Sequence, residues 1–200
     1  MISMYEIKPK FQQLLRPFLD VLYKKGVTAN QLTLMAIILS FGIGVSLWFA
    51  DDWRFGYLIV PLGLLLRMIL NALDGMMARI YNMQSNLGEI LNEIGDVISD
   101  MFIYIPIMAI PNVSPEIVCL FVGLSVTNEF SGIFGKVLGE NRRYDGPMGK
   151  SDRALVVGTG CLVYYFHPYS SEIINYSLAI CCFLMTISSF IRLKKALKDE

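Results

Sequence analysis

Two groups of polar residues, joined by a short connection, carry the side chains that could do chemistry. The first group is Asn71, Asp74 and Arg79, and the second is Asn92 and Asp96. Because residues three or four apart lie on one face of a helix, each group presents its oxygen atoms in one direction. Magnesium in proteins is usually held by one or two carboxylates together with substrate phosphates. The spacing therefore predicts a site for a divalent cation and a phosphorylated ligand.

The remainder of the chain indicates where this site lies. Of its 200 residues, 54% are hydrophobic, and the mean hydropathy is +0.53. A membrane-spanning helix needs about 20 mainly apolar residues. Six segments approach that description: Leu32–Ala50, Phe55–Arg79, Gly88–Ile110, Pro115–Leu138, Arg153–Phe166 and Ile173–Ile191. We therefore predict an all-α integral membrane protein with six transmembrane helices, in which acidic side chains are costly and need a partner.

An amphipathic helix is predicted before the first span, over residues 1–26, and residues 27–200 form the six-helix domain. Six apolar residues recur at helical spacing in this segment, namely Ile7, Phe11, Leu14, Leu15, Phe18 and Leu22, and Gly26 ends it. Two interpretations are open. The helix lies in the membrane interface, or it packs on the protein's own cytoplasmic face.

The basic residues indicate the orientation. Of the 17 Lys and Arg residues, all but Arg54 and Arg67 fall before the first span or in the connections and tail that follow the even-numbered spans. Cytoplasmic connections carry such an excess, so both termini and the predicted site face the cytoplasm. The formal net charge is zero, and nothing indicates a nucleic-acid partner.

The spacing of the polar residues also matches a known family. The order Asn71-x2-Asp74-Gly75-x2-Ala78-Arg79-x8-Gly88-x3-Asn92-x3-Asp96 resembles the signature D-x2-D-G-x2-A-R-x8-G-x3-D-x3-D of the CDP-alcohol phosphotransferases. Six of its eight fixed positions match. The segment from Gly26 to Thr33, GVTANQLT, is similar to the family's G-x-T-P-N-x-L-T. The chain looks closest to a less-characterised branch of small bacterial inner-membrane members.

The resemblance implies a reaction in phospholipid synthesis. A phosphatidyl group passes from CDP-diacylglycerol to an alcohol, and CMP is released. Asp74 would be a metal ligand, and Asp96 the general base that also shares the metal. Close contacts to the cytidine nucleotide would come from Gly75, Ala78, Arg79 and Gly88, with Asn30 and Thr33 beside them. The resemblance also implies a homodimer.

Asparagine stands at the first and third signature positions, Asn71 and Asn92. A carboxamide oxygen can bind a cation but carries no negative charge. In one hypothesis, this chain therefore binds a single Mg²⁺ or Mn²⁺ ion where the family binds two magnesium ions, or it binds the second ion only weakly. In another hypothesis, Glu89, Glu93 and Asp100 restore negative charge nearby.

The acceptor side is predicted from charge. Glu129 lies deep in the fourth span, and four basic residues follow it: Arg142, Arg143, Lys150 and Arg153. They would form a pocket for a phosphorylated or polyhydroxy alcohol, or they only satisfy the positive-inside rule. Arg67 would pair with an acid of the site or with Glu129.

Several other functions are compatible with the same residues. The Asn and Asp side chains could act as hydrogen-bonding groups between helices. The chain could be a catalytically inactive relative that serves as a membrane scaffold, or a small transporter. The same signature would also serve a CDP-linked small alcohol with diacylglycerol as acceptor. An enzyme using CDP-diacylglycerol is the leading prediction.

Overall fold

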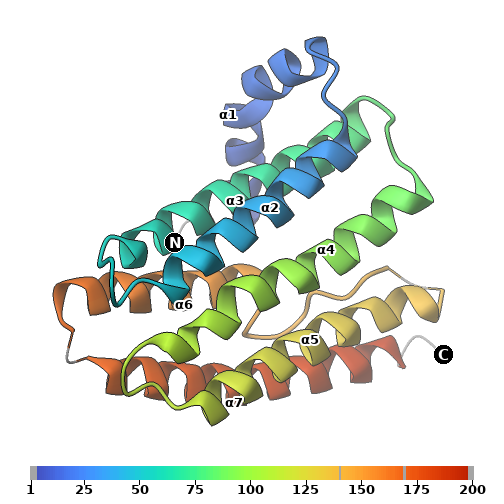
Figure 1. Cartoon of the computed structure of the whole chain (residues 1–200). Coiled ribbons are helices and arrows are strands. Elements are labelled where there is room, and N and C mark those ends of the chain that lie inside the picture. The colour runs from blue at the N-terminus through green and yellow to red at the C-terminus, as the bar shows by residue number, and fades with distance from the viewer. Residues whose placement is uncertain (1–3, 140, 169, 198–200) are drawn as a thin grey trace.

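The computed structural model of the protein describes residues 4–139, 141–168 and 170–197, with side chains from residue 11 onward. In this part of the chain every regular element is a helix (Figure 1). The elements are α1 (Met4–Lys24), α2 (Ala29–Trp48), α3 (Gly56–Ile80), α4 (Asn86–Tyr104), the short 3₁₀ helix η1 (Ile105–Ala109), α5 (Pro115–Val137), α6 (Lys150–Phe166) and α7 (Ser171–Ala196). Each of the six segments predicted as spans is helical, although the third ends as η1.

Four of these helices, α2, α3, α5 and α7, are long and apolar enough to cross a membrane. The other two predicted spans, α4 and α6, differ from these four in composition and in length, respectively. Helix α6 has 17 residues, and α4 carries the acids Glu89, Glu93, Asp96 and Asp100. Length and composition therefore support four of the six predicted spans directly.

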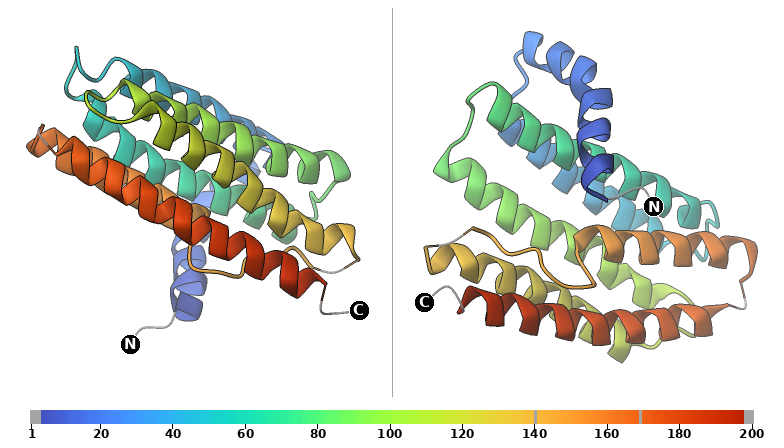
Figure 2. Two further views of the ribbon diagram at one scale, coloured as in Figure 1. Left: turned by 90° about the horizontal axis from the view of Figure 1, so that it is seen from below. Right: turned by 180° about the vertical axis from the view of Figure 1, so that it is seen from behind.

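Helix α2 lies at the centre of one half of the bundle, where it packs against both α3 and α4. The other half pairs α5 with α7, and α6 packs against α3 (Figure 2). A Cβ added at Gly44 of α2 would lie 2.0 Å from the carbonyl oxygen of Phe102, so the backbones of α2 and α4 are in direct contact.

The short connection between the second and third predicted spans favours antiparallel neighbouring helices. Helices α3 and α4 run antiparallel (Figure 1), but each packs mainly on α2 rather than on the other. The physical reason is the glycine contact described above, which draws α4 onto α2. The connection over residues 81–85 is long enough to span the resulting gap.

Helix α1 presents two apolar faces. Leu15 and Leu19 are buried in one cluster with Leu73 and Met77 of α3. The side chains of Leu14 and Phe18, by contrast, are 68% and 65% exposed. The packed face agrees with the interpretation that the helix packs on the protein itself. The exposed face is available for contact with the membrane interface. Contact with the membrane interface stays a prediction, and the side chain of Ile7 lies outside the described residues.

One end of α1 is held to the connection after α3. The hydroxyl of Tyr81 donates a hydrogen bond of 2.5 Å to Asp20, and this bond raises the pKa of Tyr81 above its ordinary value. The ring of Tyr81 stacks on that of Tyr23, with 3.7 Å between the ring centroids. These contacts fix α1 beside the end of α3 that carries the polar signature.

Helices α2 and α4 begin at the end of the bundle where α3, α5 and α7 finish, and α6 begins further in, after the connection that follows α5 (Figure 1). Local sequence determines these starts. Thr28 and Gln31 form a capping box at the start of α2, and Ser85 accepts from the Gly88 amide at the start of α4. At the start of α6, Asp152 accepts from the Gly149 amide at 2.8 Å. Such caps satisfy amides that have no partner within the helix.

Candidate active site

A cavity of about 1080 Å³ opens at the end of the bundle where these helices begin. Most of the residues predicted to form the site line it. They are Asn30, Thr33, Asn71, Asp74, Gly75, Ala78, Arg79, Gly88, Glu89, Asn92, Asp96, Glu129, Arg142 and Lys150. Four predicted residues are not part of the lining, namely Glu93, Asp100, Arg143 and Arg153. The signature residues of α3 and α4 therefore face one space, although the two helices are separated.

Asp74 lies on the α3 wall of the cavity and is only 5% exposed. Its carboxylate accepts a hydrogen bond of 3.0 Å from the hydroxyl of Thr33, on α2. No ion pair of Asp74 occurs within residues 11–139, 141–168 and 170–197. Its negative charge is thus held in place by a neutral donor and is not cancelled by a contacting base.

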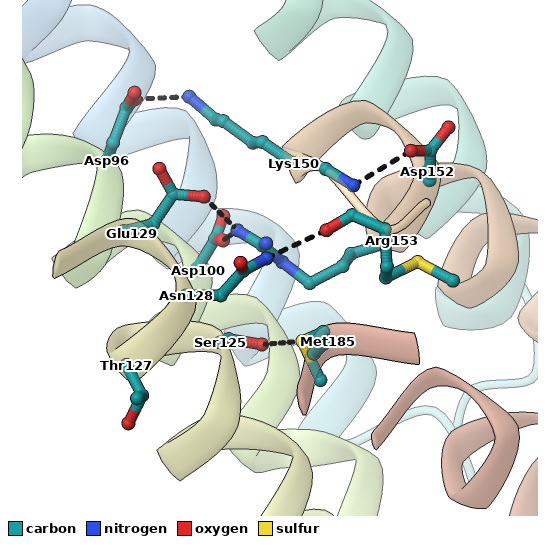
Figure 3. A network of polar contacts seen from close by, with 12 residues as sticks. Asp96, Asp100, Ser125, Thr127, Asn128, Glu129, Lys150, Asp152, Arg153 and Met185 are labelled. Carbon is teal, nitrogen blue, oxygen red and sulfur yellow. Dashed lines mark hydrogen bonds and ion pairs between the residues drawn. The ribbon is translucent and has the colours of Figure 1, made fainter. Parts of the chain in front are cut away.

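Asp96 lies on the α4 wall and has several partners. The Lys150 ammonium group, at the start of α6, forms an ion pair with its carboxylate (Figure 3). The Asn71 amide donates to the same carboxylate oxygen at 3.4 Å, and the guanidinium of Arg67 lies 4.0 Å from it. Three helices therefore meet at Asp96.

The predicted nucleotide contacts come from α2, α3 and α4 and line the same cavity. A Cβ added at Gly88 would lie 2.7 Å from the side-chain oxygen of Asn30, so the glycine permits α4 to approach α2 there. A Cβ at Gly75 would meet only the Arg79 guanidinium, at 3.4 Å. Gly75 and Ala78 thus leave room for a ligand on the face of α3.

Beneath the cavity, a chain of ion pairs crosses the bundle. Asp100 is bound by Arg67 at 2.7 Å and by Arg153 at 2.8 Å. Arg153, which is fully buried, also binds Glu129 at 2.7 Å (Figure 3). The partner of Arg67 is therefore Asp100, and Glu129 is bound by Arg153 and, at 2.5 Å, by Arg142. Buried charges require such pairing.

The acids proposed to restore negative charge are each ion-paired. Asp100 binds two arginines, as described above. Glu93 lies 3.1 Å from Arg142 and 3.8 Å from Lys136, and Glu89 forms an ion pair with Lys136. Their charges are balanced by neighbouring bases. Asp74 has no ion pair in the described part of the chain, and Asp96, although it pairs with Lys150, lines the cavity.

Residues 141–149 form a strap that joins α5 to α6 and runs beside α5 and α7 (Figure 2). Its backbone is held at several points. The Arg143 amide donates to the Gly132 carbonyl at 2.9 Å, Asn128 donates to the Met148 carbonyl at 2.7 Å, and the Met148 amide donates to Ser188 at 3.1 Å. The strap carries Arg142 and Tyr144 to the cavity.

Two basic residues of α7 hold the middle of the strap. Arg192 donates to the carbonyl of Asp145 at 2.9 Å and to that of Asn128 at 2.6 Å. Lys195 bonds to the side chain of Asp145, and this hydrogen bond lowers the pKa of Asp145 below its usual range. The strap and the end of α7 thus form one unit.

Sequence reasoning missed some residues of the cavity wall. Arg192 lines the cavity and is buried, yet its sequence position suggests only a tail charge. An arginine at the end of an apolar helix was the available signal. Phe11 and Gln12 of α1 also contribute to the wall, and nothing in their local pattern distinguishes them from other residues of that helix.

The donor set of the cavity fits one divalent cation better than two. Of the four signature positions that provide oxygen donors to the cavity, two are carboxylates, Asp74 and Asp96, and two are carboxamides, Asn71 and Asn92. Within the described residues, no group of three or more His, Cys, Asp or Glu side chains could hold a metal ion. One ion completed by substrate phosphates and water needs no such group.

Backbone amides add positive potential to the same space. The N-terminal residues of three helices line the cavity, represented by Asn30 of α2, Gly88 of α4 and Lys150 of α6. Helix N-termini carry a partial positive charge, which favours phosphate, although the Gly88 amide itself is capped by Ser85. The cavity can therefore hold a phosphorylated ligand between these helix ends and a cation.

Comparisons with known proteins agree with this architecture. Residues 26–187 match the model of the CDP-alcohol phosphatidyltransferase family. The inner membrane protein YnbA of Escherichia coli (strain K12) is 41% identical over 196 residues, which cover 98% of this chain and 97% of that protein.

Solved structures of Mycobacterium tuberculosis phosphatidylinositol phosphate synthase (PgsA1) have the same fold. The structure with CDP-DAG bound has a TM-score of 0.76 at 17% identity and covers 93% of this chain and 94% of that chain. The complex with manganese and citrate has a TM-score of 0.74 at 18% identity, covering 91% and 88%. The described helices therefore follow an arrangement already seen in a protein that binds a CDP-linked lipid.

Proposed function

The chain belongs to the CDP-alcohol phosphatidyltransferase family, and we propose that it transfers a phosphatidyl group from CDP-diacylglycerol to an alcohol, releasing CMP. One observation carries the proposal. Asp74 and Asp96, from two helices that do not pack on each other, line one cavity at which three helix N-termini meet. This arrangement suits a pyrophosphate and a cation.

The proposed reaction is a substitution at phosphorus. The acceptor hydroxyl oxygen attacks the phosphorus atom that carries the diacylglycerol group, and the bond from that atom to the bridging pyrophosphate oxygen breaks. CMP leaves with the bonding electrons, and the hydroxyl proton passes to the carboxylate of Asp96. Positioning and charge neutralisation supply most of the catalysis in such reactions, and a positioned base supplies more.

Asp74 and Asp96 would hold one Mg²⁺ or Mn²⁺ ion, with the carboxamide oxygens of Asn71 and Asn92 beside it. Such an ion neutralises negative charge on the pyrophosphate oxygens when it is bound. Thr33 positions Asp74 through the hydrogen bond already described. Asn30, Gly75, Ala78, Arg79 and Gly88 form the wall that accepts the cytidine nucleotide.

The acceptor enters from the side of the strap. Arg142 lines the cavity there, and Arg143 follows it on the strap. Arg153 lies behind this wall and Glu129 is part of it. Both act as positioning residues, because Glu129 binds both Arg142 and Arg153. A phosphorylated or polyhydroxy alcohol fits this basic wall, since arginine binds phosphate oxygens in a forked geometry.

The same proposal includes the placement in the membrane. Six helices, α2 to α7, span a bacterial inner membrane, both termini and the cavity face the cytoplasm, and α1 lies in the interface. The membrane placement is supported by the length and apolarity of four helices, α2, α3, α5 and α7. The interfacial contact is supported by the exposed Leu14 and Phe18 of α1. A homodimer and a domain boundary near residue 26 stay predictions.

The test is release of CMP by the purified full chain in detergent micelles. CDP-diacylglycerol labelled in its cytidine phosphate is supplied with Mg²⁺ or Mn²⁺ and with glycerol 3-phosphate, an inositol phosphate or glycerol in turn. We expect CMP to appear together with one new phospholipid, identified by mass spectrometry. A folded protein that releases no CMP with any acceptor and either cation would instead be the inactive scaffold.

A further inference from the structure

We infer that the ammonium group of Lys150 takes the place of a second divalent cation, so that this enzyme works with one metal ion and one lysine at the donor's pyrophosphate. The inference rests on the proposed function, because it concerns the site that would bind CDP-diacylglycerol. It also moves Lys150 from the predicted acceptor pocket to the donor side of the cavity.

The charges of the signature provide the first argument. The four signature positions hold Asn71, Asp74, Asn92 and Asp96, so two negative charges remain where the matching pattern has four. Two divalent cations bring four positive charges to the cavity, whereas one divalent cation and one ammonium group bring three. Fewer carboxylates therefore call for less cationic charge.

The position of Lys150 provides the second argument. It is the first residue of α6, and its side chain extends to Asp96 on α4, 54 positions earlier in the chain (Figure 3). Both residues line the cavity, and the Lys150 side chain is 25% exposed. An ammonium group thus already lies against the carboxylate that a metal ion would otherwise share.

The neighbouring acids provide the third argument. A second metal ion would need further carboxylates, and Asp100, the acid one turn further along α4, is bound by Arg67 and Arg153. Glu129 is bound by Arg153 and Arg142. Recruiting Asp100 would remove the 2.7 Å partner of the buried Arg67, and recruiting Glu129 would remove one of the acids that bind Arg142 and Arg153. Breaking such buried pairs is unfavourable. Asp74 and Asp96 are left for one ion.

The chemistry of lysine suits this role. An ammonium group has three donors and no acceptor, so Lys150 can keep its bond to Asp96 and still donate to a phosphate oxygen. Its flexible stem lets it follow the phosphate as the donor settles. It would neutralise part of the charge on the pyrophosphate, as a cation does.

The experiment counts metal ions instead of turnover. The full chain in detergent micelles is equilibrated with Mn²⁺ and CDP-diacylglycerol, and bound Mn²⁺ per chain is measured by electron paramagnetic resonance. We expect one ion for the wild type and two for the triple variant Asn71→Asp, Asn92→Asp, Lys150→Gln. In Lys150→Gln alone, we expect one ion and a donor affinity lower by about tenfold or more, because a hydrogen bond to a charged group is lost.

Lys136→Gln is the matched control, because Lys136 also lines the cavity but pairs with Glu89. Its Mn²⁺ count should stay at one and its donor affinity should change less than twofold. Two ions or none in the wild type would overturn the inference, even if the triple variant failed to fold. If CMP release fails while the count is one, the proposed function alone is wrong. If CMP is released and the count is two, the inference alone is wrong.

Discussion

Arg67 of α3 and Asp100 of α4 form an ion pair of 2.7 Å, one helical turn deeper in the bundle than Asn71 and Asp96. Their helices pack on α2 and not on each other, so this pair is a direct link across the floor of the cavity. Asp100 also binds Arg153 of α6. The depth and width of the cavity therefore depend on a carboxylate that does not line it.

Asp100→Asn should destabilise the fold rather than remove a substrate contact. The change takes the anionic partner at 2.7 Å from the buried guanidinium of Arg67 and leaves Arg153 with Glu129 alone. Breaking a buried ion pair costs about 3–5 kcal/mol. The measurement is the free energy of unfolding in detergent micelles. Asp52→Asn, at an exposed position, should change it by no more than about 0.5 kcal/mol. Equal stability of the two variants would contradict a structural role for Asp100.

Asp96→Asn should reduce CMP release by about 10²- to 10⁴-fold, the usual contribution of a general base. The asparagine keeps the shape of the side chain but cannot take the proton from the acceptor. Steady-state rates with labelled CDP-diacylglycerol provide the measurement, and circular dichroism checks the fold. Turnover within tenfold of the wild type would exclude Asp96 as the base.

Thr33→Val should weaken Mn²⁺ binding by about tenfold, because the valine removes the hydroxyl that orients the carboxylate of Asp74. A Mn²⁺ titration followed by electron paramagnetic resonance measures the dissociation constant. Ser40→Ala is the matched control on the same helix, since Ser40 donates to the Ala36 carbonyl. If both variants bind Mn²⁺ equally well, the hydrogen bond to Asp74 has no part in cation binding.

Gly146→Ala should raise the acceptor KM while leaving CDP-diacylglycerol affinity nearly unchanged. Gly146 has φ +106, and a Cβ there would lie 2.6 Å from Ser188, so an alanine displaces the strap. Gly139→Ala separates backbone strain from the steric clash with Ser188. At that position φ is +86, but no atom lies within 4 Å of the added Cβ. The acceptor KM should rise more for Gly146→Ala than for Gly139→Ala. A larger effect on donor affinity than on acceptor KM would remove the strap from the acceptor side.

Tyr81→Phe should loosen α1 without unfolding the bundle. The hydrogen bond from Tyr81 to Asp20 is lost, and such a bond contributes about 0.5–1.5 kcal/mol, or more when the acceptor is charged. Hydrogen exchange of the α1 amides should become several-fold faster. Tyr176→Phe, at an exposed position on α7, is the control. Unchanged exchange in Tyr81→Phe would show that the packing of Leu15 and Leu19 alone holds the helix.

The signature residues could be predicted because their arrangement is local. Asn71 and Asp74 are three apart, and Asn92 and Asp96 are four apart, so helical periodicity alone places each pair on one face. The six helical segments followed from runs of apolar residues for the same reason. The packing of α4 on α2 could not be predicted in this way, because it depends on a close backbone contact at Gly44 between two different helices.

The ionic partners could not be predicted, because they are distant in the sequence. Lys150 and Asp96 are 54 positions apart, and Arg153 and Asp100 are 53 apart. No periodicity connects residues on different helices. The sequence therefore leaves open whether Arg67 pairs with an acid of the site or with Glu129. Only the relative rotation of α4, α5 and α6 determines which acid meets which base.

The path of the strap depends on two glycines, Gly132 and Gly146, which let its backbone lie close to α5 and α7. A Cβ at Gly132 would meet the Arg143 carbonyl at 2.6 Å, and one at Gly146 would meet Ser188 at the same distance. These close approaches and the hydrogen bonds to the strap backbone determine its path. Arg142 and Tyr144 extend from this backbone to the cavity. If the strap borders the acceptor, as proposed, substitutions there would alter the choice of alcohol while the helical frame stays intact. Related chains would then diverge in their products without a new fold.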